Sequence, residues 1–158
     1  MGMWLDTEFN GFCGELLSIA LIAEDGSYFY KVFDFSKLEL DDWVLQNVIS
    51  NIFLSPDTET VDRSLCQPKF DIQLQLSVFL NKYDTVEIIA DWPDDIGYLC
   101  ELMIISPGRC ILTPSQIKFT IDRELGSISR VPHHAYYDAL ANMEMTLTKE
   151  LERNHGKV

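Results

Sequence analysis

Basic residues are scarce in this chain. Lys and Arg number 12 against 25 Asp and Glu, which gives a formal net charge of −13 over 158 residues. Tight, non-specific binding to long nucleic-acid duplexes is therefore not expected, because such binding depends on Lys and Arg contacts to phosphates. Nucleic acid in general is not excluded, since carboxylates that hold divalent cations contact a phosphate backbone through those cations.

The chain also lacks paired metal-binding cysteines. Its four cysteines are scattered and form no CxxC pair, and none of the three histidines lies near a cysteine in the sequence. This pattern does not support a zinc knuckle. Free thiols in a reducing cytoplasm are expected instead, so we predict a cytoplasmic protein.

Long apolar segments are missing as well. The longest run, Leu16 to Ala23, is too short to span a bilayer and is interrupted by Ser18. No basic segment opens the chain, so neither a secretory signal nor a membrane partner is expected. The content of 47% hydrophobic and 23% charged residues is typical of a globular protein, and the length predicts a single domain over residues 1–158.

The hydrophobic pattern predicts an α/β fold with a five-stranded mixed sheet flanked by helices. The first three strands should form an antiparallel meander, and the last two should run parallel. The expected strands are residues 3–9, 15–23, 28–33, 86–90 and 117–121. The expected helices are residues 41–53, 72–83, 95–105 and a last helix that begins at 134 or 135. The polar stretch 55–68 is expected to be a loop.

The first expected strand contains two carboxylates. Asp6 and Glu8 are one residue apart, so their side chains point to the same face of the strand. Two like charges on a buried face repel each other and resist desolvation unless a cation lies between them. The alternative is an edge strand whose polar face is in water.

Two further acidic features follow. The sequence Asp91-Trp92-Pro93-Asp94-Asp95 comes directly after the expected strand 86–90, and Asp138 follows His133 and His134 at the start of the last helix. Each feature has a simpler explanation, because acidic residues commonly cap helices or lie exposed in their first turn.

Taken in order, the three features resemble the motifs of the DEDDh 3′→5′ exonucleases, a ribonuclease H-like family that includes polymerase proofreading subunits, oligoribonuclease and RNase T. Asp6-Thr7-Glu8 is similar to the first motif, Asp95 to Leu99 to the second, and His133 to Asp138 to the third. Asp94 and Asp95 remain alternatives for the second motif, which lacks the family's usual Asn before its aspartate. The resemblance extends from residue 3 to about 150 and is most detailed for a short bacterial exoribonuclease branch.

The resemblance implies a ribonuclease H-like fold and a two-metal mechanism with Mg²⁺ or Mn²⁺. Asp6, Glu8 and Asp138 would hold the ion that activates water, and Asp6 would bridge to a second ion assisted by Asp95. His133 would be the general base. The implied reaction releases nucleoside 5′-monophosphates from the 3′ ends of single-stranded RNA or short oligonucleotides, and family likeness implies a homodimer.

Several other residues receive an expected role. Thr7, Phe9, Phe12 and Tyr98 lie in or beside the motifs and are expected to bind substrate, the aromatics by stacking on terminal bases or alternatively by packing in the core. Phosphate contacts are expected from Lys118, Arg123 and Arg130, or these residues simply lie in solvent. His134 and His155 are expected at the surface or as caps. Three other functions stay open: a non-catalytic module of the same fold that binds nucleic acid or a partner, a structural or partner-binding protein whose acidic patches are merely solvated, and an exonuclease that prefers DNA.

Overall fold

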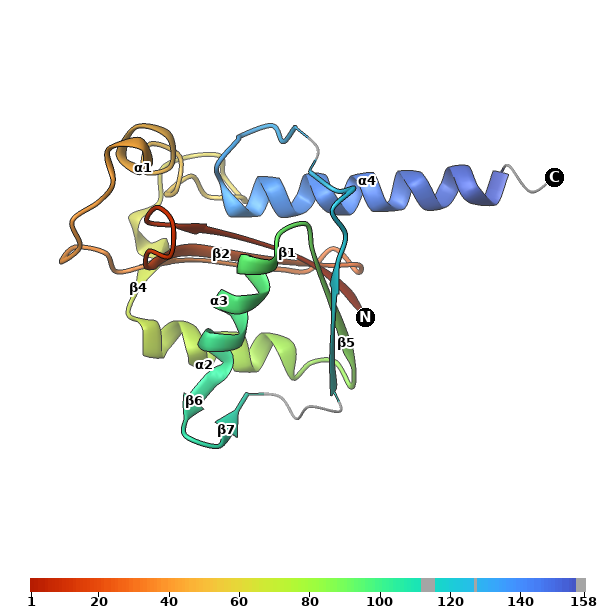
Figure 1. The fold of residues 1–158 in the computed structure, drawn as a ribbon, viewed down its shortest axis with the longest axis horizontal. Coiled ribbons are helices and arrows are strands. Elements are labelled where there is room, and N and C mark those ends of the chain that lie inside the picture. The colour runs from red at the N-terminus through yellow and green to blue at the C-terminus, as the bar shows by residue number, and fades with distance from the viewer. Residues whose placement is uncertain (112–115, 127, 156–158) are drawn as a thin grey trace.

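The structure is a computed structural model that describes residues 1–111, 116–126 and 128–155. A mixed sheet of six strands lies at its centre, with helices on both faces (Figure 1). The order of the strands across the sheet is β4-β3-β2-β1-β5-β8. The strands are β1 (Gly2–Phe9), β2 (Leu16–Ala23), β3 (Tyr28–Phe33), β4 (Cys66–Gln67), β5 (Val86–Ala90) and β8 (Ile117–Ile121).

The expected α/β class and strand directions are confirmed. β1, β2 and β3 form an antiparallel meander, while β5 runs parallel to both β1 and β8. The expected number of strands was too low, because the predicted loop 55–68 contributes β4, which pairs parallel with the end of β3. Two residues are too few to show the alternation by which a strand is predicted.

In the part of the chain that the structure describes, four α-helices and a short 3-10 helix accompany the sheet. Their bounds are α1 (Asp42–Asn47), η1 (Arg63–Leu65), α2 (Lys69–Leu80), α3 (Pro93–Met103) and α4 (Ala135–His155). A separate two-stranded sheet follows α3, with β6 (Ile104–Ser106) antiparallel to β7 (Arg109–Cys110). None of the described helices is long and apolar enough to cross a membrane.

The predicted helix over residues 41–53 was too long. Asp41 caps α1 by accepting from the backbone N–H groups of Trp43 and Val44, but the helix ends at Asn47. Turns follow, and they still place Val48 and Ile52 in the core, with 1% and 0% of their surface exposed. The apolar spacing therefore predicted correctly that these residues are buried. It did not predict that turns follow the short helix.

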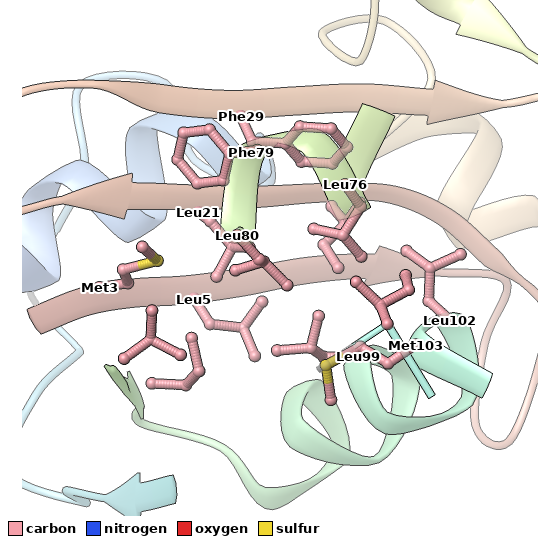
Figure 2. Packing of buried hydrophobic residues seen from close by; sticks show 14 of the residues in the cluster. Met3, Leu5, Leu21, Phe29, Leu76, Phe79, Leu80, Leu99, Leu102 and Met103 are labelled. Carbon is pink, nitrogen blue, oxygen red and sulfur yellow. The ribbon is translucent and has the colours of Figure 1, made fainter. Parts of the chain in front are cut away.

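β2 is apolar on both of its faces because helices cover both sides of the sheet. Its residues Ile19 and Leu21 pack in a cluster with α2 and α3, whereas Leu17 and Ile22 pack in a second cluster with α1 and α4. Figure 2 shows the first cluster, in which side chains from β1 and β2 meet those of α2 and α3. Its labelled members are Met3, Leu5, Leu21, Phe29, Leu76, Phe79, Leu80, Leu99, Leu102 and Met103.

Candidate metal centre

β1 presents its two carboxylates to the face of the sheet that α4 covers. The indole Nε1 of Trp4 donates to the hydroxyl of Thr146 on α4 at 2.9 Å. Asp6 and Glu8 follow Trp4 at intervals of two residues and so point to the same face. The intervening residue Leu5 packs in the opposite core. The alternation of the strand thus directs both carboxylates toward the start of α4.

Asp138 meets them from the first turn of α4. Its Oδ2 accepts a hydrogen bond from the backbone N–H of His134 at 3.1 Å, which fixes the carboxylate at the helix N-terminus. One oxygen each from Asp6, Glu8 and Asp138 lies within 4.8 Å of the others. All three side chains are half-buried. This triad (the Glu8 triad) could hold a metal ion.

A second triad forms around the same Asp6. Oxygens of Asp6, Asp91 and Asp95 also lie within 4.8 Å of one another (the Asp91 triad). Asp91 directly follows β5, and Trp4 pairs with Ile89 in the parallel β1–β5 ladder. Asp6 and Asp91, each two residues further along, therefore reach the same edge of the sheet. The two triads share one carboxylate, as a ligand that bridges two ions would.

The structure distinguishes Asp95 from Asp94. Asp95 is 3% exposed, and its Oδ1 accepts from the hydroxyl and backbone N–H of Thr7, at 2.6 and 3.2 Å. Asp94 is exposed and accepts from the indole N–H of Trp92 at 2.8 Å. One helical residue turns a side chain by about 100°, so only Asp95 faces β1. Thr7 is itself buried, and its side chain positions Asp95.

Burial and mutual repulsion make this cluster unusually basic. Burial raises the pKa of Asp6 well above its ordinary value, and the charges of Asp95 and Glu8 raise it further. Burial, with the charges of Asp138 and Asp95, raises the pKa of Glu8 to about 8. Burial raises the pKa of Asp95 to about 7, although the Thr7 hydrogen bonds oppose the shift. The cluster thus needs positive charge near it, from protons or from cations.

Asp91 is held by a residue that the sequence analysis did not single out. The side-chain amide of Asn142 on α4 donates to Asp91 Oδ1 at 3.2 Å, and its Oδ1 accepts from the backbone N–H of Gly126 at 2.9 Å. Asn142 is buried. Asn142 could have been identified in the sequence as a polar residue on the apolar side of the predicted last helix. Asp91 could have been identified as an acidic residue directly after a predicted strand.

His133 lies at the edge of the Glu8 triad. Its side chain is exposed, and its ring makes an edge contact with that of Trp43, at a centroid distance of 4.9 Å. Burial raises the pKa of Asp138, whereas the backbone N–H of His134 and the neighbouring His133 lower it. His133 has a φ of +59°, a left-handed conformation that His adopts more readily than most residues. Trp43 was not predicted to be near the site.

The expectation that His134 is a surface or capping residue was wrong. The side chain is completely buried, its ring stacks on Tyr30 at 4.6 Å, and its Nε2 lies 3.0 Å from the carbonyl oxygen of Leu54. Burial lowers its pKa, so the imidazole is neutral and belongs to the core. The side chain of His155 lies outside the described part of the structure.

The expected substrate-binding aromatics have different surroundings. The rings of Phe9 and Tyr98 stack at 5.0 Å, and the Tyr98 hydroxyl donates to the carbonyl of Gly14 at 2.7 Å. Tyr98 lines a cleft of about 700 Å³ between α3 and the β1–β2 turn. Phe12 on that turn is 91% exposed, so its alternative interpretation as a core residue was wrong.

Arg123 is the predicted phosphate contact that lies beside the carboxylates. Its guanidinium donates to the backbone carbonyl of Asp91 at 2.7 Å and lies 3.8 Å above the centre of the Trp92 indole ring. The other two candidates are engaged elsewhere, Lys118 with Glu87 and Arg130 with Glu59, at the surface.

Comparison with known proteins gives no further guide to function. No family model matches the chain, and no curated protein is similar enough in sequence to match it.

Proposed function

We propose that this chain is a metal-dependent 3′→5′ exonuclease with a ribonuclease H-like fold, acting on single-stranded RNA or short oligonucleotides. The observation that carries the proposal is the pair of carboxylate triads that share Asp6. Their oxygens come from β1, α3, α4 and the end of β5. A sheet that only needed stability would not gather half-buried carboxylates at one edge.

The donor set fits two Mg²⁺ or Mn²⁺ ions, because carboxylate oxygens are hard ligands. Two such ions, about 3.5–4 Å apart, supply an activated water and stabilise the charge on the leaving oxygen of a phosphodiester. Asp6, Glu8 and Asp138 would hold one ion, while Asp6, Asp91 and Asp95 would hold the other. Compared with the sequence resemblance, this arrangement adds Asp91 to the ligands.

The residues around the ions have separate tasks. Asp138 keeps its position through the N–H of His134, and Thr7 orients Asp95. His133, exposed at the edge of the Glu8 triad, would take the proton from the attacking water, which requires its neutral form. Its contact with Trp43 limits the directions in which the imidazole points.

The cleft that Tyr98 lines suits the end of a nucleic-acid strand, although none of its described lining residues belongs to the two triads. Among its described lining residues are four carboxylates and a single cation, Lys69; the carboxylates belong to Glu15, Asp34, Asp94 and Glu101. Such walls repel phosphate but accept an uncharged base and sugar, and Tyr98 offers an aromatic ring. A terminal nucleoside fits this environment better than a continuing strand, which supports an exonuclease.

The Arg123–Trp92 pair, beside Asp91, offers another contact to a nucleic-acid strand. Because the guanidinium lies over an exposed indole next to Asp91, the pair offers a positioned cation to a phosphate and an aromatic ring to a base. We place the enzyme in the cytoplasm, since all four of its cysteines are free. The non-catalytic binding module is the weaker alternative, because ligands and a base candidate are all present.

The decisive experiment is digestion of RNA and DNA oligomers labelled at either end, in Mn²⁺ and in excess chelator. We expect stepwise shortening from the 3′ end that stops in chelator, with RNA degraded faster than DNA. Asp6→Asn should abolish the activity, and Asp94→Asn, a matched change of an exposed carboxylate, should not. Activity that persists in chelator, or cleavage of a circular substrate, would exclude the proposal. A binding module would retain the oligomers uncut.

A further inference from the structure

Ser18 carries a buried hydroxyl that has no hydrogen-bond partner. It is the only polar residue of β2, and its side chain is 0% exposed. Among the described residues, its Oγ is one of three buried side-chain atoms that lack a partner. A buried hydroxyl in this state costs folding free energy, and buried polar side chains in proteins are normally hydrogen-bonded. Because stability alone would favour Ala at this position, the hydroxyl needs a functional explanation.

The register of the sheet places Ser18 beside Glu8. In the antiparallel ladder of β1 and β2, Ser18 is the residue directly opposite Glu8, so the two side chains lie on the same face. The Cβ atoms of such a pair are about 4.5–5.5 Å apart, a separation that a Glu side chain can span. On its other side Ser18 is opposite Val32 of β3, whose side chain has no polar atom. Of the two residues directly opposite Ser18, only Glu8 can therefore accept a hydrogen bond from its side chain.

Tyr30 is the alternative partner of this hydroxyl. It lies diagonally from Ser18 on β3, because it pairs with Ala20. The Tyr30 hydroxyl donates to the carbonyl oxygen of Ile52 at 2.5 Å, so Tyr30 is held in the core without Ser18. The two possible partners predict different effects. Loss of the Ser18 hydroxyl would reduce the stability of the core if it served Tyr30, and would disturb a metal ligand if it serves Glu8.

Other carboxylates of the candidate metal centre already have a side chain that positions them. The hydroxyl of Thr7 donates to Asp95 at 2.6 Å. The side-chain amide of Asn142 donates to Asp91 at 3.2 Å. A carboxylate has several lone pairs, so Glu8 can contact a cation and accept a hydrogen bond at the same time. Such contacts orient metal ligands, and Ser18 is placed to supply one to Glu8.

We propose that Ser18 is a positioning residue of the metal centre, whose hydroxyl donates to the Glu8 carboxylate when Glu8 binds Mg²⁺ or Mn²⁺. The inference rests on the proposed function, because it requires that the Glu8 triad holds an ion. The hydrogen bond would restrict the directions in which the Glu8 side chain points. A polar residue that weakens an otherwise apolar strand would thereby serve the site.

Calorimetric titration with Mn²⁺ alone, without nucleic acid, tests this role. Ser18→Ala should weaken Mn²⁺ binding by roughly 10–100-fold, as the loss of a contact that orients a ligand typically does. In chelator the same variant should melt no lower than wild type, because it removes a buried hydroxyl that has no partner. Ser27→Ala is the matched control, at a serine between β2 and β3 whose hydroxyl donates to Asp25 at 2.6 Å. It should leave Mn²⁺ binding unchanged.

Ser18→Cys separates the hydrogen bond from the volume of the side chain. The thiol fills the site but is a weak donor, so this variant should also lose Mn²⁺ affinity. Wild-type affinity in Ser18→Ala or in Ser18→Cys would overturn the inference and leave the proposed function intact. A lower melting temperature of Ser18→Ala in chelator would overturn it as well, because the hydroxyl would then serve the core. A wild-type chain that binds no Mn²⁺ would overturn both the inference and the proposed function.

Discussion

Without metal, this protein should lose stability as the pH rises above neutrality. The pKa of Glu8 is raised from 4.5 to about 8 by burial and by the neighbouring carboxylates. At pH 7 the folded chain therefore binds a proton at Glu8 that the unfolded chain has already released. Since the folded state binds more protons, the free energy of unfolding falls as the pH rises through 8.

The magnitude follows from the shift. Between pH 7 and pH 8.5, Glu8 alone should cost about 1 kcal/mol of stability, and Asp95, with a pKa of about 7, should add a few tenths. For a chain of this length the melting temperature should fall by roughly 3–5 °C. His134 has the opposite effect on stability, because burial lowers its pKa and the free energy of unfolding then rises with pH. This effect is confined to lower pH. It is complete near pH 7, above the ordinary histidine pKa of 6.5.

Thermal melting in chelator at pH 7 and pH 8.5, repeated with Mn²⁺, measures this effect. Mn²⁺ should raise the melting temperature at both pH values and most at pH 8.5, because the ion replaces the protons that the cluster loses. Asp6→Asn should melt higher than wild type in chelator at pH 8.5 and should respond little to Mn²⁺. Asp94→Asn should behave like wild type. A melting temperature that does not fall between pH 7 and pH 8.5 in chelator, or that ignores Mn²⁺, would refute the reasoning.

Four other outcomes are expected for single variants. Asp95→Asn should lose at least roughly 10²-fold in turnover of a labelled oligomer, whereas Asp94→Asn should stay within a few-fold of wild type; the reverse would mean that Asp94 is the ligand. His133→Ala should cut turnover by roughly 10²–10⁴ at saturating Mn²⁺. His134→Ala should instead lose about 2–4 kcal/mol of stability in denaturant titration and keep its turnover while folded, because it removes a packed core ring. Arg123→Ala should raise KM and reduce the slope of log affinity against log salt by about one, which Lys118→Ala should not do.

The sheet was largely predictable because its strands carry strong local signals. β2 and β5 are short apolar runs that end at turn residues or acidic residues, and β8 was correctly placed at residues 117–121. β4 was not predictable, since two residues carry no period and their pairing with β3 depends on the path of a polar loop. The end of α1 at Asn47 was also not predictable from the sequence, because successive turns bury apolar residues at helical spacing as well as a helix does.

The residues of the candidate site were only partly predictable from the sequence. Asp6, Glu8, Asp95 and Asp138 all reach one cluster, and these positions followed from motif spacing. Asp91 was ambiguous in the sequence because strand alternation alone cannot tell which acidic residue after β5 points inward. The parallel register of β1 and β5 decides it. Burial of His134 was likewise hidden, since its neighbour His133 has the same side chain and differs only in how the backbone turns before α4.

One physical conflict connects the sequence pattern to the structure. β1 would be a more stable strand with apolar residues in place of Asp6 and Glu8. The raised pKa values of both carboxyl groups reflect the free-energy cost of burying them near other acidic groups. The supporting contacts all act to hold the carboxylates in place: Thr7 on Asp95, Asn142 on Asp91, and the α4 N-terminus on Asp138. None of them neutralises the charge. Only a proton or a cation can, and divalent ions would replace the protons that the raised pKa values of Asp6 and Glu8 otherwise keep in the cluster, so the arrangement is consistent with a centre built around metal.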